Sequence, residues 1–334
     1  MGFLKRVLSV ILLFLFPGCA AFAGTAPSAD VLLAQGHVDD AISSLQYQIS
    51  STPKNAQSHN LLCRAFLVVE NWDGGIPACQ KAVALEPESS QYHLWLGRIY
   101  GGKASHSSFI SAAGLAGKVR HEFETAVRLD PTNVDARADL AEFYVEAPGI
   151  VGGGTDKAAV QAREMATQDP PMAHLVQAWI AEKNKDRTAA DAEYRAAIET
   201  SGGKAGTWLS LAQFYRRTGR LDAMQDALQH ALAARKNQYI LMSVADVLVR
   251  TKLDQPRAVQ LLRRYLASET VEEAPAFKAH YLLGTLLERG GDKAAAEQEY
   301  RAALSLASSF SPARSALDRL NRQEPQPPST CGTE

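Results

Sequence analysis

This 334-residue chain has no excess of basic residues and few aromatic ones. Its formal net charge is −1, and no basic stripe of the kind that binds nucleic acid stands out. Aromatic residues make up 7% of the chain against 46% for all hydrophobic residues, so alanine and leucine must supply most of the core. The composition therefore argues against a nucleic-acid partner and favours closely packed short helices over a β-sandwich.

Only one long hydrophobic run is present, and it lies at the N-terminus. Lys5 and Arg6 precede the almost unbroken apolar stretch 7–16, and Ala21-Phe22-Ala23 reads as a cleavage site. This pattern predicts a signal peptide over residues 1–23 and a mature chain that begins at Gly24, in the periplasm or outside the cell. No second apolar segment is long enough to cross a bilayer, so we expect no transmembrane segment in the mature chain.

The same N-terminal stretch has a second interpretation. Phe16-Pro17-Gly18-Cys19 resembles a lipobox, in which Cys19 would become a lipidated N-terminus. Phe stands where Leu is preferred, and the adjacent Pro is unfavourable. A freely soluble exported protein and a lipid-anchored one both remain open at this point.

Motifs of enzymes and metal sites are also missing. The chain has no G-x-S-x-G elbow, no H-E-x-x-H and no paired C-x-x-C. Gly149 and Gly154 have the spacing of a phosphate-binding loop, but Thr155-Asp156 follows, which places an acid where the essential Lys belongs. We therefore predict a protein that is not an enzyme and holds no cofactor or metal, with the glycine-rich loop acting as a flexible elbow between helices.

What the chain does contain is a repeat. Pro53 and Pro87 stand 34 residues apart, and the second of them closes the run 82–87, Ala-Val-Ala-Leu-Glu-Pro. A similar run, Ala-Val-Arg-Leu-Asp-Pro, ends at Pro131 after an insertion of ten residues. A period of 34 is typical of a helix-turn-helix solenoid, in which no single unit can bury its apolar face alone.

Two units show the repeat most clearly, each with a small residue midway in its first helix and Ala residues in its second. The first unit has Trp208, Leu211, Ala212, Tyr215 and Gly219, followed by Met224, Leu228 and Ala231; the second has His280, Leu283, Gly284, Leu287 and Gly291, followed by Ala296, Tyr300 and Ala303. These residues resemble the tetratricopeptide repeat (TPR) motif, W-x2-L-G-x2-Y and later A-x3-F-x2-A.

The resemblance implies an all-α, right-handed superhelical solenoid of about eight antiparallel helix pairs over residues 24–322. Insertions are expected near residues 101–118 and 147–156, a capping helix over 311–322 and a disordered tail over 323–334. Both insertions, including Ser108-Phe109 and the stretch 148–154, resemble a subgroup of exported bacterial TPR proteins without a well-defined function.

In TPR proteins the first helix of each unit lines a concave groove. The groove candidates in this chain are Gln57, Asn60, Arg64, Gln91, Arg98, Glu142, Trp179 and Arg216. Arg64 and Arg98 occupy equivalent places in successive units, so they would present two guanidinium groups to a carboxylate, or would simply be solvated charges that keep the groove wet. The lysines of the family's carboxylate clamp are absent.

Cysteine and histidine also invite interpretation. Cys63 and Cys79 hold mirror positions across one helical hairpin, which predicts a possible disulfide in an oxidising compartment; the alternative is a pair of small buried hydrophobes. Cys331 would be left over on the tail. His59, His93 and His280 each occupy the fourth place of their units, where packing explains them without a metal.

These observations predict an exported scaffold without enzymatic activity that binds a protein or peptide in its groove and helps to organise a cell-envelope complex. One alternative is a lipid-anchored factor for envelope or polysaccharide-export assembly. The other is a small-ligand-binding protein or an enzyme with an unrecognised site in the groove.

Overall fold

The fold is known from a computed structural model that describes residues 27–323. The predicted signal peptide, Cys19, Cys331 and the tail beyond Gln323 lie outside the described residues. Within 27–323 the chain forms α-helices, one short 3-10 helix and no strand. Their bounds are α1 Ala29–Gln35, α2 Val38–Ser51, α3 Ala56–Val68, α4 Trp72–Leu85, α5 Ser90–Ser105, α6 Phe109–Leu129, α7 Val134–Glu146, η1 Gly149–Val151, α8 Thr155–Met165, α9 Pro170–Lys183, α10 Arg187–Thr200, α11 Ala205–Arg217, α12 Leu221–Ala233, α13 Tyr239–Thr251, α14 Gln255–Leu266, α15 Ala276–Arg289, α16 Lys293–Leu306 and α17 Ser311–Gln323.

Each odd-numbered helix from α1 to α15 packs against the helix that follows it, which gives eight hairpins, with α17 as an additional helix against α16. This confirms the predicted all-α solenoid and its capping helix. Local chemistry sets the helix ends: Asn55, Asn133 and Asp292, for example, accept a backbone N–H at the start of the helix each one caps. Since two helices cannot bury their apolar face alone, each hairpin packs it against its neighbours, and the core clusters span several hairpins.

Small residues allow the two helices of a hairpin to approach closely. Gly97 on α5 lies against the ring of Phe123 on α6, and Gly284 on α15 lies against Tyr300 on α16. A Cβ atom at Gly284 would stand 2.7 Å from the Tyr300 ring. The small residue midway in the first helix and the aromatic residue in the second are therefore two halves of one contact.

The two insertions lie in consecutive hairpins. The first lengthens α5 to 16 residues and α6 to 21, against 12–14 residues in most other helices. The second is the glycine-rich loop, whose backbone amides are used internally: Gly154 N–H donates to Tyr144 O at 2.8 Å and Gly153 N–H to Pro148 O at 3.2 Å. The loop is thus a compact turn with its amides occupied, rather than the open elbow expected from its glycines.

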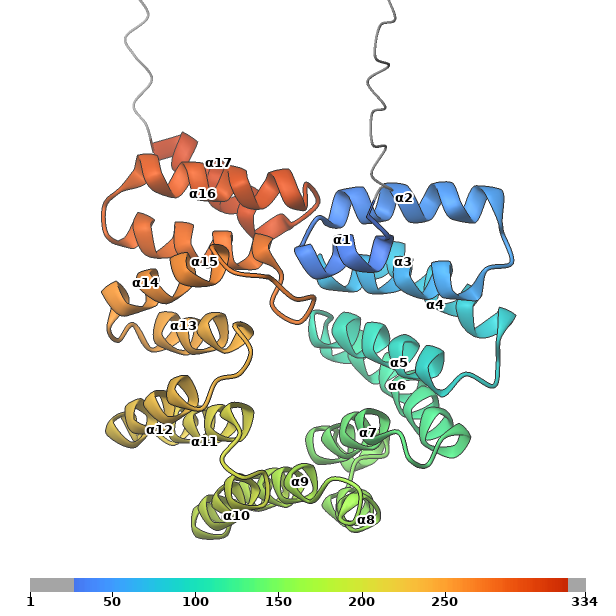
Figure 1. The fold of residues 1–334 in the computed structure, drawn as a ribbon. Coiled ribbons are helices and arrows are strands. Elements are labelled where there is room, and N and C mark those ends of the chain that lie inside the picture. The colour runs from blue at the N-terminus through green and yellow to red at the C-terminus, as the bar shows by residue number, and fades with distance from the viewer. Residues whose placement is uncertain (1–26, 324–334) are drawn as a thin grey trace, which may run out of the picture.

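The array returns to its own beginning. In Figure 1, α15 and α16 lie beside α1 and α2, after the chain has passed through α9 and α10 on the opposite side. One core cluster contains Leu33 and Val38 near the start of the array together with Phe277 and Phe310 near its end. The solenoid therefore closes into a ring, a feature that the repeat pattern did not predict.

Polar contacts join the same two ends, and we call this junction the seam. Thr270 Oγ1 donates to Ala34 O at 3.2 Å, and Ser308 N–H donates to the Asp39 carboxylate at 2.8 Å. Gly36 has a φ of +80° and approaches Ala276 so closely that a Cβ atom would lie 2.9 Å from its backbone nitrogen. The seam needs this glycine both for its backbone conformation and for space.

Candidate binding site on the first helices of the hairpins

The predicted groove residues do not gather in one place. Glu142 on α7 and Trp179 on α9 line one cavity, whereas the other six candidates lie outside it. Gln57 and Gln91 are exposed, Asn60 is buried, and Arg216 is half-buried with an Nε that has no hydrogen-bond partner within residues 27–323. The remaining two candidates, Arg64 and Arg98, are engaged by other parts of the chain.

Arg64 and Arg98 share one tryptophan. The guanidinium carbon of Arg64 lies 4.9 Å from the centre of the Trp95 ring, and that of Arg98 lies 4.6 Å from it. Arg64 also pairs through both its Nε and an Nη with Glu272 at the seam, and Arg98 Nε donates to Asp139 at 2.6 Å. Each guanidinium already has a carboxylate and an aromatic face, so neither of the two open interpretations, a pair of free cations for a carboxylate ligand or simply solvated charges, describes them.

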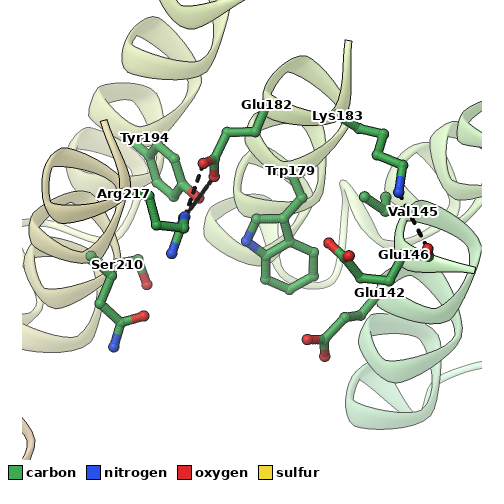
Figure 2. A pocket seen from close by; sticks show the side chains of 10 residues that line it. Glu142, Val145, Glu146, Trp179, Glu182, Lys183, Tyr194, Ser210 and Arg217 are labelled. Atoms are coloured by element: carbon green, nitrogen blue, oxygen red, sulfur yellow. Dashed lines mark hydrogen bonds and ion pairs between the residues drawn. The ribbon is translucent and has the colours of Figure 1, made fainter. Parts of the chain in front are cut away.

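The cavity has a volume of about 450 Å³ and lies between three successive first helices. Its lining takes three residues from each of these helices and one from α10. They are Glu142, Val145 and Glu146 of α7; Trp179, Glu182 and Lys183 of α9; Ser210, Gln213 and Arg217 of α11; and Tyr194 of α10. In each first helix two lining residues stand three and four positions from the third, which is Glu142, Trp179 or Gln213, and these spacings put the side chains on one side of the helix. Figure 2 shows Trp179 in the middle, with acidic residues on one side and an ion pair on the other.

One wall of the cavity is internally satisfied. Arg217 donates to both oxygens of Glu182, at 3.0 and 2.7 Å, and the Tyr194 hydroxyl donates to the same carboxylate at 2.6 Å. Burial raises the pKa of Tyr194, and the neighbouring Glu182 raises it further, so the phenol remains a hydrogen-bond donor. Such a network is rigid, because every charged group in it has a partner.

The opposite wall carries unpaired negative charge. Within residues 27–323 neither the Glu142 nor the Glu146 carboxylate has an ion-pair partner, and Lys183 Nζ donates to the backbone oxygen of Glu146 at 3.2 Å instead. Glu142 is exposed to solvent, but partial desolvation by the surrounding helices raises the pKa of its carboxyl group. The nearby carboxylates of Asp139 and Glu146 raise this pKa further, although Arg98 opposes the effect. This wall is therefore a place where a positive group from outside would lower the electrostatic free energy.

Sequence reasoning found two of the ten lining residues. It missed, among others, Glu146 and Lys183, which stand four residues after Glu142 and Trp179 in their helices. A spacing of four keeps two side chains on the same helical face, so extending the candidate list by one turn would have included them.

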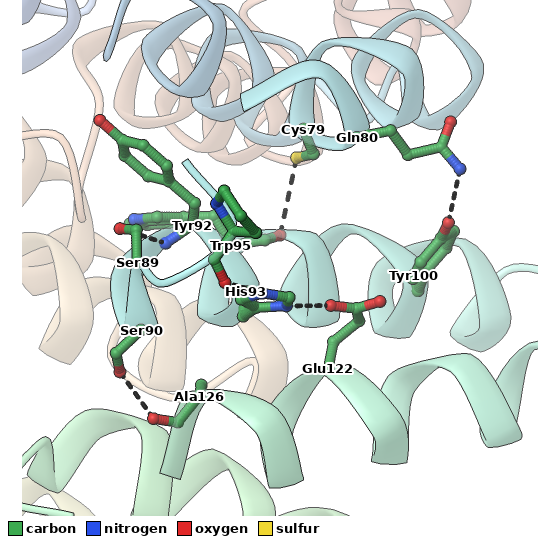
Figure 3. A network of polar contacts seen from close by, with 11 residues as sticks. Cys79, Gln80, Ser89, Ser90, Tyr92, His93, Trp95, Tyr100, Glu122 and Ala126 are labelled. Atoms are coloured by element: carbon green, nitrogen blue, oxygen red, sulfur yellow. Dashed lines mark hydrogen bonds and ion pairs between the residues drawn. The ribbon is translucent and has the colours of Figure 1, made fainter. Parts of the chain in front are cut away.

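The histidines are held by hydrogen bonds that repeat from unit to unit. His59 Nε2 and His93 Nε2 each lie 3.0 Å from a proline carbonyl six residues earlier, Pro53 O and Pro87 O. His93 Nδ1 also lies 2.6 Å from a Glu122 oxygen, as Figure 3 shows, and His280 Nδ1 lies 2.6 Å from Glu299 in the same way. Within the described part of the chain, no three metal-ligand side chains come together.

Cys63 and Cys79 form a disulfide between α3 and α4. Their Cα atoms are 5.1 Å apart, and both side chains are buried. The bond closes a loop whose ends are 16 residues apart in sequence. Of the two interpretations that the sequence left open, the structure contains the bonded one.

No helix within residues 27–323 is both long enough and apolar enough to span a bilayer.

Hairpins of helices stacked in sequence, with a cavity on their first helices, define the class of α-solenoid binding proteins. Two family models of the tetratricopeptide repeat match the sequence, over residues 205–238 and residues 254–312. The chain contains tetratricopeptide repeats, and this repeat fold suggests a scaffold for protein–protein interaction.

Several solved TPR structures share the fold. Yeast Tom70 is 13% identical, with a TM-score of 0.54 and coverage of 91% of this chain and 66% of its own. A TPR protein from Parabacteroides merdae is 13% identical, with a TM-score of 0.42 and coverage of 80% of this chain and 98% of its own. The Cut9–Hcn1 structure matches 87% of this chain with 14% identity and a TM-score of 0.41, and this chain spans about half, 54%, of the matched chain. The sequence matches no curated protein. At such low identity the likeness to Tom70 shows the fold alone.

Proposed function

We propose that this protein is an exported scaffold that binds a segment of a partner protein on the first helices of its ring and helps to organise a cell-envelope complex. The observation that carries the proposal is the cavity between α7, α9 and α11, which combines an accessible tryptophan with unpaired carboxylates. A partly apolar cavity with a few convergent polar groups is the usual form of a recognition site.

Two features support export. The stretch 1–23 has the three parts of a signal peptide, and the Cys63–Cys79 disulfide suits an oxidising compartment. Intact-mass analysis of the protein purified from its native cells tests this part of the proposal. A mature chain that begins at Gly24 is expected, whereas a retained N-terminal stretch or a lipid on Cys19 would contradict a freely soluble exported protein.

Partner binding is tested by filling the cavity. Gln213→Trp places a large side chain among the lining residues, whereas Gln298→Trp makes the same change on the exposed face of α16. Crosslinked envelope extract is passed over the native protein and over each variant. A partner retained by the native protein and by Gln298→Trp but lost by Gln213→Trp is the expected result; equal retention by all three would overturn the proposed site.

A further inference from the structure

The four tryptophans of this chain differ in what covers their rings. Trp72 is stacked by His106 with centroids 5.2 Å apart, and Trp208 is stacked by His230 at 4.3 Å. Trp95 has Arg64 and Arg98 over its ring. Within residues 27–323, no Arg, Lys or His lies over Trp179, and this ring lines the 450 Å³ cavity.

At Trp95 the chain places a cation beside a tryptophan and a carboxylate. The Arg98 guanidinium lies 4.6 Å from the centre of the Trp95 ring, and its Nε donates to Asp139 at 2.6 Å. A cation gains there both from the ring quadrupole and from a charge-assisted hydrogen bond. Trp179 likewise offers an aromatic face beside carboxylates, but within residues 27–323 no Arg, Lys or His lies over its ring. Lys183 and Arg217 of the same cavity are bonded to Glu146 O and to Glu182 instead.

The carboxylates beside Trp179 are available for such a cation. Figure 2 shows Glu142 and Glu146 on one side of Trp179 and the Glu182–Arg217 pair on the other. Glu182 is occupied by Arg217 and Tyr194, and Lys183 is directed to the backbone of Glu146 rather than to a carboxylate. Glu142 and Glu146 therefore face the cavity without an ion pair to any residue of 27–323, although Arg98 acts on Glu142 from a distance and Lys183 lies at the backbone of Glu146.

From this arrangement we propose that the cavity binds a lysine or arginine side chain of the partner segment, with the charged group over Trp179 and between Glu142 and Glu146. The proposal rests on the proposed function, because it names the chemical class of the segment that the same cavity holds. It also reverses the preference for an acidic peptide that Arg64 and Arg98 suggested in the sequence.

Short peptides test the charge preference directly on the native protein. The probes are Ac-Gly-Lys-Gly-NH2 and Ac-Gly-Arg-Gly-NH2, each compared with a neutral counterpart that carries norleucine or citrulline. Binding is followed by the indole N–H resonance of Trp179 in the 15N-labelled protein, assigned with the Trp179→Phe variant. We expect a saturable shift of this resonance, with affinity at least about tenfold higher for the charged peptides than for the neutral ones.

Two double variants test whether Glu142 and Glu146 supply the negative charge that binds the lysine peptide. Glu142→Gln/Glu146→Gln removes the two carboxylates of the cavity, and Glu88→Gln/Glu199→Gln removes two exposed carboxylates elsewhere. The first double variant should weaken binding of the lysine peptide about tenfold, and the second should leave it unchanged. Equal affinity for lysine and norleucine peptides, equal shifts at all four indoles, or no shift at Trp179 would each overturn the proposal.

Failure of this inference can be told apart from failure of the proposed function. If Gln213→Trp abolishes partner capture while the native protein does not distinguish charged from neutral peptides, the cavity is a binding site for a segment of another class. If the charged peptides bind at Trp179 but no partner is lost on filling the cavity, the recognition chemistry holds and the scaffold role at this site fails.

Discussion

At the scale of single residues, the structural role of a glycine depends on the residue that it faces across the hairpin. Gly284 and Gly97 are buried against aromatic rings, whereas Gly114 lies in the exposed first half of α6, where an added Cβ atom would meet nothing within 4 Å. The same residue type therefore serves close packing at two positions and serves no contact at the third. Substitutions by alanine separate these cases.

Gly284→Ala should lower the free energy of unfolding by about 1–3 kcal/mol, because the new methyl group overlaps the Tyr300 ring. Gly114→Ala should raise the free energy of unfolding by about 0.5–1 kcal/mol, because alanine costs less backbone entropy than glycine within a helix. Urea unfolding followed by circular dichroism measures both. Changes of the same sign would contradict this account of the hairpin contact.

His93 makes stability depend on pH. The hydrogen bond to Glu122 raises the pKa of His93 and outweighs the opposing effect of burial. Because the folded-state pKa lies above the unfolded value of about 6.5, the stabilisation is complete below that pH and is lost as pH rises through the folded-state pKa.

The free energy of unfolding of the native protein should therefore decrease between about pH 6 and pH 9, and Glu122→Gln should make this decrease smaller. Glu88→Gln, a change at an exposed position, should keep that decrease. Unfolding midpoints measured at each pH give the comparison. An unchanged slope in the Glu122 variant would assign the pH dependence to other groups.

At the scale of helices, one hairpin is reinforced covalently. The Cys63–Cys79 bond joins α3 and α4, which also carry Arg64 and the contacts to the next hairpin. Reduction should lower the free energy of unfolding by up to about 3 kcal/mol, the entropy of closing a loop of this length in the unfolded chain. Thermal unfolding with and without reductant measures the loss. The Cys63→Ala/Cys79→Ala variant serves as the control, since it should be insensitive to reductant; a native protein equally insensitive would contradict the prediction.

At the scale of the whole molecule, the distinguishing feature is the seam. Arg64 on α3 and Glu272 between α14 and α15 are 208 residues apart in sequence and form an ion pair with each side chain at most 25% exposed. The guanidinium is held at the same time over Trp95, which Arg98 links to Asp139 on α7. Charge and packing thus connect the end of the array to its second, third and fourth hairpins.

Reversing one charge should open the ring. Glu272→Lys places two cations side by side and should cost about 2 kcal/mol, with an increase in the radius of gyration measured by small-angle X-ray scattering. Glu273→Lys makes the same change at the adjacent exposed residue and should leave the dimensions unchanged. A Glu272 variant with native dimensions would show that the apolar contacts of Phe277 and Phe310 close the seam by themselves.

The sequence by itself determined the repeated unit. The 34-residue period, the small residue opposite an aromatic one and the N-capping residues are local, so they predicted eight hairpins and the helix that begins at Ser311. Two of the cavity residues, Glu142 and Trp179, followed from the same register. These features can be read from the sequence because each depends on neighbours within one or two hairpins.

Only the tertiary structure decided how the hairpins come together as a whole. A small rotation per hairpin accumulates over eight units, and whether the last meets the first depends on the sum rather than on any one turn. That closure brought Glu272 to Arg64. Contacts between neighbouring hairpins paired Arg98 with Asp139 and left Glu142 and Glu146 without an ion pair beside Trp179. Charged side chains far apart in the sequence form ion pairs only once the fold has placed them in contact. A local sequence pattern therefore cannot predict which of them will stay without a partner.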